Sequence, residues 1–400
     1  MKRAITSACF VILAFTFTHA QSGPRWITAW GTSQQGLAQA ALSTTTLRLN
    51  ARVTIAGDAV RIRLDNAYGK NAVRVGRAYV GVRARGAVLV AGSNKPALFN
   101  GSESTTIPPG GSVRSDPVAM DVLAMQDLAV SLYIPEADVQ VSQHTGAMTT
   151  SYAASGDQAA VDGGDPFKAT LTTMPLLKAI DVSAKASTGA IVAFGDSITD
   201  GTCSTIDAHD RWEDWLAVRL ALNAVKPGAH QAVVNEGIGG NTLTSEGLQP
   251  PPDSTPGLER FERDVMSHQG VADVILFMGT NDIRRGATAA QVIDAMTRMA
   301  AAVKSRRMKV FAATIIPRHS VPPAGTNSGW NEAKTAIRRE VNDWIRTRAK
   351  LDGVLDFDAT VRDPGNADLI FAPFNCDGIH PTPRGYYEMG KSVHLTLFTR

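Results

Sequence analysis

A serine follows directly after an apolar run in the segment AIVAFGDSITDGTCSTIDAHD, which spans residues 190–210. The first residues of this segment are typical of a buried strand, which ends near Gly195 and Asp196. A serine hydroxyl at the end of a strand is a candidate nucleophile for acyl transfer, provided that a base removes its proton. The alternative is that Ser197 is an ordinary turn residue, and the remaining residues of the chain decide between the two.

A base and a carboxylate that could orient it occur near the C-terminus, in the segment NCDGIHPTPRGYY (residues 375–387). Asp377 precedes His380 by three residues, so its carboxylate can hold one ring nitrogen while the other nitrogen faces a serine. Histidine is the usual base near neutral pH. The pattern predicts Ser197 as the nucleophile, His380 as the base and Asp377 as the group that orients the base.

Two further segments supply donors for the negative oxygen of a tetrahedral intermediate. They are NEGIGGN (residues 235–241) and GTND (residues 279–282), and each follows an apolar run. The backbone N–H groups of Ser197 and Gly240 and the side-chain amide of Asn281 are the predicted oxyanion donors. Gly239 is the alternative to Gly240, and a helix cap is the alternative for Asn281. For Asp282, a helix cap is the favoured interpretation.

The second half of the chain contains the elements that must position these residues. Apolar runs that end in polar or glycine-rich residues alternate with helix-like stretches such as DRWEDWLAVRLAL and AAQVIDAMTRMAAAV, and a final helix is expected after Pro383. This alternation predicts a parallel α/β sheet with helices on both faces. Functional residues in such sheets gather at the carboxyl ends of the strands, where all four segments lie.

The first half of the chain has a different pattern, with a period of two from about Trp26 to Tyr152. Runs such as AVRIRLDN and LAVSLYI are separated by turn signals, which predicts an antiparallel β-sandwich. We expect a jelly-roll-like accessory domain over 24–175 and a catalytic domain over 186–400, connected within residues 153–187. Arginines on the predicted strands are expected on the solvated face: Arg48, Arg52, Arg61, Arg63 and Arg74.

The four segments, in this order, resemble the conserved blocks of the GDSL/SGNH hydrolase family. GDSITDG matches the nucleophile block, NEGIGGN the glycine block, GTND the asparagine block and DGIH the Asp-x-x-His block. The match covers residues 190–400 and departs from the family motif at Ile198, where the family has leucine. The resemblance implies a flavodoxin-like fold and the same site residues: Ser197, Gly240 and Asn281 around the oxyanion, and Asp377 and His380 beside the nucleophile.

The first half also resembles that of secreted bacterial GDSL esterases of the xylan-esterase-like branch, through RWITAWGTSQQ, IPPGGSVRSDPV and TTSYAASGD. This resemblance implies an ester substrate, with small acyl groups, acetyl above all, on a polysaccharide or oligosaccharide. The alternatives are a lipase or phospholipase acting on longer acyl chains, and a glycan-binding protein without catalysis. Whether the β-rich half binds glycans or is purely structural is left open by the sequence.

The N-terminal segment MKRAITSACFVILAFTFTHA is typical of a secretory signal peptide that is cleaved after Ala20. It predicts a secreted or periplasmic protein, and no other run is long and apolar enough to predict membrane insertion. Without Lys2 and Arg3, the basic residues nearly balance the 37 acidic ones, and no basic cluster indicates nucleic-acid binding. Neither a HExxH motif nor a His/Cys cluster predicts a metal site, and no cofactor is expected.

Histidines other than His380 lack a carboxylate partner in a motif. His209 is expected in a solvated loop, and the others beyond the signal peptide are expected to be surface or structural residues: His144, His230, His268, His319 and His394. Trp212 and Trp215, three residues apart on a predicted helix, are expected to pack in the core and not to stack on sugars.

Cys203 and Cys376 are the cysteines that remain after removal of the signal peptide. In an oxidising compartment such a pair is more often bonded than free. Because Cys203 follows the nucleophile and Cys376 directly precedes Asp377, the two loops must approach each other if the catalytic residues assemble. We therefore predict a Cys203–Cys376 disulfide between them.

Overall fold

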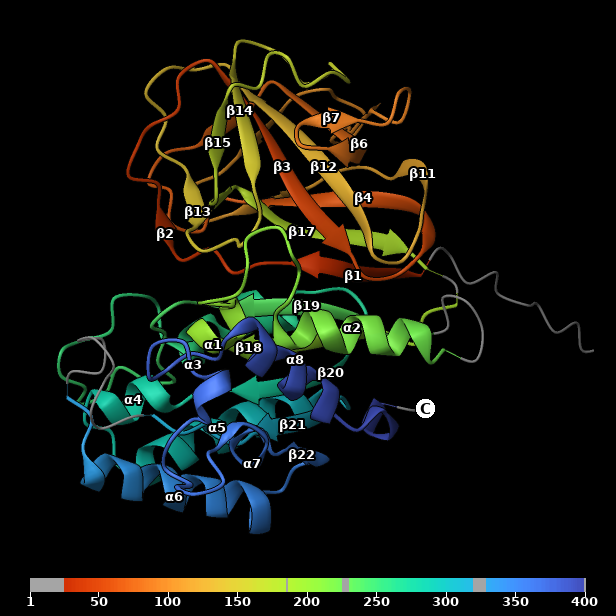
Figure 1. Ribbon diagram of the computed structural model, residues 1–400. Helices are drawn as coiled ribbons and strands as arrows, with labels where there is room; N and C mark the ends of the chain where they lie inside the picture. The colour runs from red at the N-terminus through yellow and green to blue at the C-terminus, as the bar shows by residue number, and fades with distance from the viewer. Residues whose placement is uncertain (1–24, 185, 225–229, 319–328, 399–400) are drawn as a thin grey trace, which may run out of the picture.

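The computed structural model describes residues 25–184, 186–224, 230–318 and 329–398. It contains a β-rich N-terminal region and a C-terminal α/β domain, stacked one on the other (Figure 1). The predicted signal peptide and His319 lie outside the described residues. Within the described residues, no helix has the length and apolar character needed to cross a membrane.

The β-rich region contains two antiparallel sheets whose buried side chains belong to one apolar cluster, with Ile62 and Ile180 from one sheet and Leu49 and Val130 from the other. One sheet has the order β1 (Trp26–Gly31), β17 (Leu177–Ser183), β4 (Gly57–Asp65) and β10 (Ser112–Arg114), and β11 (Val118–Val122) also pairs with β4. The other has the order β15 (Ala169–Leu171), β14 (Ser151–Ser155), β3 (Thr45–Val53), β12 (Gln126–Ile134), β6 (Arg77–Arg85) and β7 (Val88–Leu89), and β8 (Lys95–Pro96) also pairs with β6.

Smaller sheets complete this region: β16 (Met174–Pro175), β13 (Ser142–His144) and β2 (Gly36–Leu37) form one, and β5 (Val73–Val75) pairs with β9 (Thr105–Ile107). The alternating pattern of the sequence therefore corresponds to strands with one buried face, as in β11.

Two expectations for this region need correction. The β-rich region continues past the predicted domain end at residue 175, because β17 pairs with β1 on one side and with β4 on the other, and the chain leaves this region only after Ser183. The arginine prediction is wrong for Arg48 and Arg63, which are buried. The Arg48 guanidinium donates to the Ser131 hydroxyl and to backbone carbonyls, and Arg63 donates to the backbone and hydroxyl oxygens of Ser267. These acceptors replace water, which the period of a strand cannot reveal.

The α/β domain is built on a parallel sheet, as predicted. Its strands lie in the order β19 (Ala232–Gly237), β18 (Ala190–Gly195), β20 (Val271–Phe277), β21 (Lys309–Ala313) and β22 (Gly353–Leu355). Counted along the chain, the order is 2-1-3-4-5, so the connection direction reverses beside β18. Ligands bind at such a point in open α/β sheets, outside the carboxyl ends of the strands.

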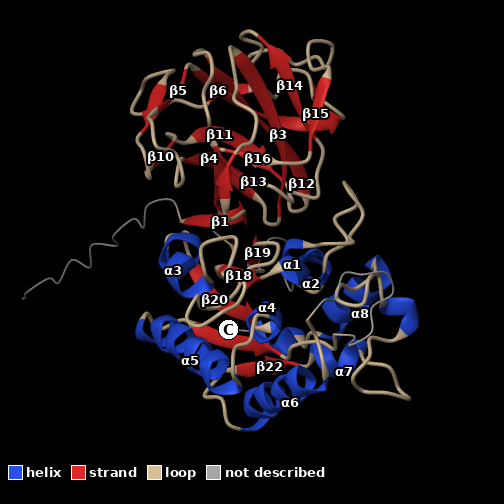
Figure 2. Cartoon of the chain, turned by 90° about the vertical axis from the view of Figure 1, so that its left-hand side faces the viewer, coloured by secondary structure: helices blue, strands red, loops and turns tan. Residues whose placement is uncertain are grey.

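Helices cover both faces of this sheet, as Figure 2 shows. Alternate residues of β18 face opposite sides: Val192 and Phe194 belong to one apolar cluster, and Ile191 and Ala193 to another. The first cluster includes side chains of α3 (Gly257–Phe261), α5 (Ala289–Ser305) and α6 (Glu332–Thr347). The second includes α2 (Trp212–Leu222), α7 (Phe357–Val361) and α8 (Pro383–Ser392). Trp212 is fully buried as predicted, but Trp215 is only partly buried and packs edge-on against Tyr387. The remaining helical elements are α1 (Ser197–Asp200), α4 (Thr280–Arg284), the π-helical turn Glu262–Met266 and the 3-10 turns Ala372–Phe374 and Leu395–Phe398.

The two parts of the chain meet in a close-packed, charged interface. β1 lies against β19 at Gly31, where a Cβ atom would come within 2.7 Å of Val234 and 2.8 Å of the Glu236 carboxylate, so only glycine fits there. Lys178 of β17 is fully buried and bonds Glu236 at 2.7 Å and Asp264 at 3.0 Å. Buried charges are costly unless they are paired, so the β-rich region is a fixed part of the molecule, not a tethered module.

Candidate active site

Ser197 lies at the turn between β18 and α1, where the chain leaves the sheet. Asp196 caps the helix, because its carboxylate accepts the Ile198 N–H at 3.0 Å, and Gly201 ends the helix in the left-handed conformation. Burial raises the pKa of the Asp196 carboxyl to about 7. This short helix fixes the Ser197 hydroxyl at the carboxyl edge of the sheet, and its side chain points toward the loop that carries His380.

His380 and Asp377 complete a continuous line of hydrogen bonds with Ser197. The Ser197 Oγ lies 2.8 Å from His380 Nε2, and His380 Nδ1 lies 2.8 Å from Asp377 Oδ2. The other Asp377 oxygen accepts the backbone N–H groups of Ile379 and His380, so the carboxylate also shapes the turn. Burial acts to raise the pKa of Asp377, but the hydrogen bonds from His380 and from the backbone lower it to about 2. The carboxylate therefore stays ionised and holds the ring with Nδ1–H toward it.

The glycine turn after β19 distinguishes the two candidate backbone donors. The Gly239 N–H donates to Asp200 Oδ2 at 2.9 Å and is therefore already used. Gly240 is exposed and has a φ of 71°, a left-handed conformation that favours glycine. Within the described residues, no acceptor is recorded for the N–H of Gly240 or of Ser197. This arrangement favours Gly240 over Gly239 as an oxyanion donor.

Asn281 and Asp282 lie together in α4, and both are buried. The Asn281 side-chain amide donates to the Asn241 carbonyl at 3.1 Å, which leaves its second N–H for a ligand. The expectation that Asp282 caps a helix is wrong: its carboxylate accepts the N–H groups of Leu243, at 2.9 Å, and of Thr244, at 3.2 Å. Asp282 thus holds the loop that follows the glycine turn, and burial raises the pKa of its carboxyl to about 6.

The predicted disulfide between Cys203 and Cys376 is present, with Cα atoms 6.5 Å apart and a sequence separation of 173. It connects the loop after the nucleophile to the loop that carries Asp377 and His380. The Tyr386 hydroxyl of α8 adds a second connection, because it donates to the Thr202 carbonyl at 2.7 Å. The loop that carries His380 is therefore held against the loop that follows Ser197 by a covalent bond and by a part-buried hydrogen bond.

Several charged residues around the site were not predicted from the sequence. His144 and His268, expected only to be surface or structural, are buried with carboxylate partners, Asp200 at 2.9 Å and Glu236 at 2.6 Å. Arg260 is also buried; its guanidinium donates to the Gly195 carbonyl at 2.9 Å. A single signal could have identified Lys178: it is a charged residue inside the apolar run PLLKAIDV.

Removing the Asn281 amide should slow the reaction without weakening substrate binding. We expect Asn281→Ala to lower kcat roughly 100- to 1,000-fold with little change in KM, because an oxyanion donor acts mainly in the transition state. Steady-state kinetics on p-nitrophenyl acetate measure both constants. Asn331→Ala, which removes only the helix cap of α6, is the matched control and should leave kcat unchanged. A higher KM with an unchanged kcat would contradict the role of Asn281 as an oxyanion donor.

Removing the disulfide should destabilise the fold. Cys203→Ser and Cys376→Ser are each expected to lower the free energy of unfolding by about 2–5 kcal/mol, because the bond closes a long loop in the unfolded chain. The double variant should lose no more than either single variant, since one replacement already breaks the bond. Urea denaturation measures the loss. Free thiols at Cys203 and Cys376 in the denatured, unreduced protein would show that the bond does not form.

Comparison with known proteins gives a family for this domain. Residues 193–387 match the GDSL-like Lipase/Acylhydrolase family. No match was found among curated proteins.

Among solved structures, the chain is similar to a lipolytic protein of the G-D-S-L family from Veillonella parvula, with 22% identity, a TM-score of 0.38 and coverage of 53% of this chain and 98% of that one. It is also similar to a carbohydrate acetylesterase from Sinorhizobium meliloti, with 19% identity, a TM-score of 0.37 and coverage of 52% and 95%. An aryl esterase from M. smegmatis gives 20% identity, a TM-score of 0.39 and coverage of 51% and 95%.

The family match spans all four sequence blocks, from the strand before Ser197 to the helix after His380. Residues 193–387 therefore match the GDSL-like lipase/acylhydrolase family across the whole predicted site, and this match supports a carboxylic ester hydrolase.

Proposed function

We propose that the protein is a serine esterase in which Ser197 attacks the ester carbonyl, His380 acts as the base and Asp377 orients it. The observation that carries this proposal is the line of two 2.8 Å hydrogen bonds from Ser197 through His380 to Asp377. Ser197 N–H, Gly240 N–H and the Asn281 amide are the proposed oxyanion donors. Gly239 is not among them, because its N–H already donates to Asp200, whereas the Asn281 amide uses only one of its two N–H groups on the Asn241 carbonyl.

The reaction has two steps. His380 Nε2 takes the Ser197 proton as Oγ bonds to the carbonyl carbon, and the same proton then goes to the leaving alcohol as the ester bond breaks. Water attacks the resulting acyl-serine, again with His380 as the base, and releases the acid. The negative charge that forms on the carbonyl oxygen in each step is stabilised by fixed N–H donors.

We propose small acyl esters of carbohydrates, acetyl esters above all, as the substrate. The described loops that carry the site support this assignment, because the side chains that they expose, wholly or in part, are mostly small or polar, among them Thr202, Ser204, Thr244 and Asn375. Such a rim suits a hydrated sugar better than a long acyl chain. The xylan-esterase-like sequence pattern of the β-rich region supports the same class.

An acyl-chain series tests this substrate class. We expect kcat/KM to fall from p-nitrophenyl acetate through butyrate to octanoate, and acetate to be released from acetylated xylan. Chemically deacetylated xylan is the control for background acid. Higher kcat/KM on octanoate would contradict the carbohydrate ester and favour a lipase-type enzyme, and no hydrolysis of any ester would favour a glycan-binding protein.

We also propose that the protein acts outside the cytoplasm, in the periplasm or the medium. A disulfide between catalytic loops supports this location, because such bonds persist in oxidising compartments. Expression of the full chain in a bacterial host, followed by fractionation and N-terminal sequencing, tests the proposal. A mature N-terminus at Gln21 is expected, and an uncleaved cytoplasmic protein would contradict it.

A further inference from the structure

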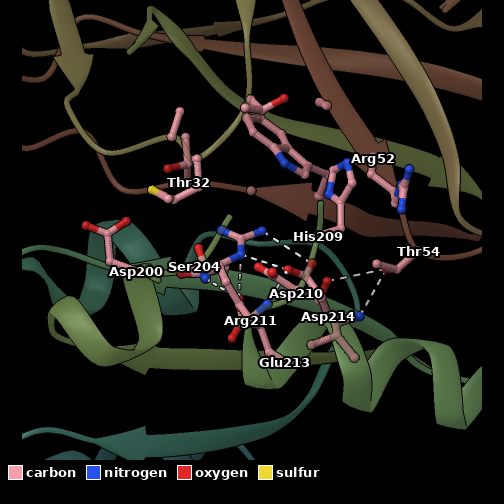
Figure 3. Close-up of a pocket in the computed structure, with 18 of the residues that line it drawn as sticks. Thr32, Arg52, Thr54, Asp200, Ser204, His209, Asp210, Arg211, Glu213 and Asp214 are labelled. Carbon is pink, nitrogen blue, oxygen red and sulfur yellow. Dashed lines mark hydrogen bonds and ion pairs between the residues drawn. The ribbon is translucent and has the colours of Figure 1, made fainter. Parts of the chain in front are cut away.

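A small polar cavity lies directly behind the nucleophile helix, between the β-rich region and the α/β domain (Figure 3). Asp200 lies at its edge, and His209 and Arg52 line it from the side of the β-rich region in the view. Its volume is about 40 Å³, room for a few water molecules and no larger ligand. The cavity is therefore not a substrate site, but the side chains around it connect the two parts of the chain.

Asp200 connects the nucleophile helix to the glycine turn. It is the last residue of α1, which begins at Ser197, and it is buried. Its Oδ2 accepts the Gly239 N–H at 2.9 Å. That bond fixes the Ile238–Gly239 peptide, the unit directly before the Gly239–Gly240 peptide that carries the Gly240 N–H, and so restricts where the Gly240 N–H points. The position of a proposed oxyanion donor thus depends on the position of one carboxylate.

His144 holds the second oxygen of this carboxylate from the β-rich region. It is the last residue of β13, is buried, and places Nε2 2.9 Å from Asp200 Oδ1. Its Nδ1 lies 2.8 Å from the Ser33 carbonyl. A carbonyl and a carboxylate both accept hydrogen bonds, so both ring nitrogens must donate, which requires the charged imidazolium.

The charges nearby agree with this protonation state. Burial acts to lower the pKa of His144, but the Asp200 carboxylate and the backbone contacts with Ser33 and Gly146 raise it above the usual value. Arg211, the cation across the cavity, is already paired with Glu213 at 3.1 Å and with Asp214 at 2.8 Å. The remaining charged or titratable side chains that line the cavity are Arg52, His209 and Asp210.

We propose that His144 is a positioning residue for ester hydrolysis: through Asp200 it holds the glycine turn so that the Gly240 N–H faces the oxyanion. The proposal rests on the proposed function and extends it, because it makes the β-rich region part of the working active site. His144 would affect the stabilisation of the transition state and not the binding of substrate, so its removal should lower kcat and leave KM unchanged.

The test compares four variants by steady-state kinetics, with active sites titrated by a fluorophosphonate probe. His144→Ala and Asp200→Ala should each lower kcat per titrated site roughly 10- to 100-fold with KM unchanged, because small misplacements of catalytic groups cost about that much. Asp200→Asn should stay within a few-fold of wild type. Its side-chain oxygen can accept the Gly239 N–H while its amide donates to a neutral His144.

His230→Ala is the matched control, because it removes a different buried histidine of the same interface. His230 lies 3.1 Å from the Thr54 carbonyl across the interface and does not contact the glycine turn. We expect it to change stability but not kcat per titrated site.

An unchanged kcat in His144→Ala, an equal loss in His230→Ala, or an Asp200→Asn variant as slow as Asp200→Ala would each overturn the positioning role. Failure of the proposed function is distinguishable, because the wild-type enzyme itself would then neither react with the probe nor hydrolyse esters. The near-isosteric Asp200→Asn variant keeps the test decisive if an alanine variant fails to fold.

Discussion

Ser197→Ala is expected to lower kcat by roughly 10⁵- to 10⁶-fold on p-nitrophenyl acetate while leaving KM within a factor of about two. The hydroxyl oxygen is the atom that would bond to the acyl carbon, and within the described residues it is the hydroxyl that hydrogen-bonds His380 Nε2. The proposed donors Gly240 and Asn281 remain in the variant, so slow hydrolysis by water in the proposed oxyanion hole should persist above the uncatalysed rate. Steady-state kinetics on freshly purified protein measure the loss.

The matched control for this experiment is Ser305→Ala. Ser305 is exposed at the end of α5 and bonds only its own helix, at Ala302, so its loss should leave kcat unchanged. Urea denaturation should show that Ser197→Ala folds as stably as wild type, since a small polar atom is removed. A Ser197→Ala variant that keeps most of its activity would show that another residue is the nucleophile.

Lys178→Met is expected to have the largest effect on stability, a loss of about 3–5 kcal/mol in the free energy of unfolding. Lys178, Glu236 and Asp264 are completely buried, and the lysine bonds both carboxylates. Burial acts to raise the pKa of each carboxyl, but Lys178 and neighbouring cations hold both values below the usual range. Without the lysine, the interface keeps two buried carboxylates and loses a shared cation.

The pH dependence of this loss has a definite sign. Carboxyls with a lowered pKa in the folded state stabilise the protein above their unfolded pKa, and that contribution disappears as the pH falls through the folded value. The difference in the free energy of unfolding between wild type and Lys178→Met should therefore be largest near pH 7 and should decrease as the pH falls into the acid range.

Lys391→Met is the control for this pair of experiments, because Lys391 bonds Glu388 at 3.3 Å with 56% and 30% of the two side chains exposed. Such surface pairs contribute about 0–1 kcal/mol. Urea denaturation of both variants at several pH values measures the two losses in the free energy of unfolding and their pH dependence. A Lys178→Met variant as stable as Lys391→Met would contradict the account of the interface.

The parallel sheet and the residues at its edge could be predicted because local signals report them directly. Apolar runs that end in Gly195 and Gly237 mark strands whose carboxyl ends must converge. The Asp377–His380 spacing reports a contact within one turn. The disulfide followed from a geometric requirement, since Cys203 and Cys376 flank residues that must meet.

The contacts that the sequence did not predict all join distant segments. Arg48 lies at an ordinary strand position, and only the fold brings the Ser131 hydroxyl and several carbonyls around it. His144 and Asp200 are 56 residues apart, and no local pattern pairs them. The period of a strand reports which residues share a face, but it does not report whether that face meets water or other protein groups.

The most direct measurement of the central claim is to trap the acyl-enzyme. Wild-type protein is mixed with p-nitrophenyl acetate, quenched in acid during turnover, digested and analysed by mass spectrometry, with His380→Ala and Ser197→Ala in parallel. One acetyl group is expected on the peptide that contains Ser197 in wild type, and none there in Ser197→Ala. Acetylation of a different residue at the catalytic rate, or turnover without any acyl-enzyme and with Ser197→Ala still active, would contradict the central claim.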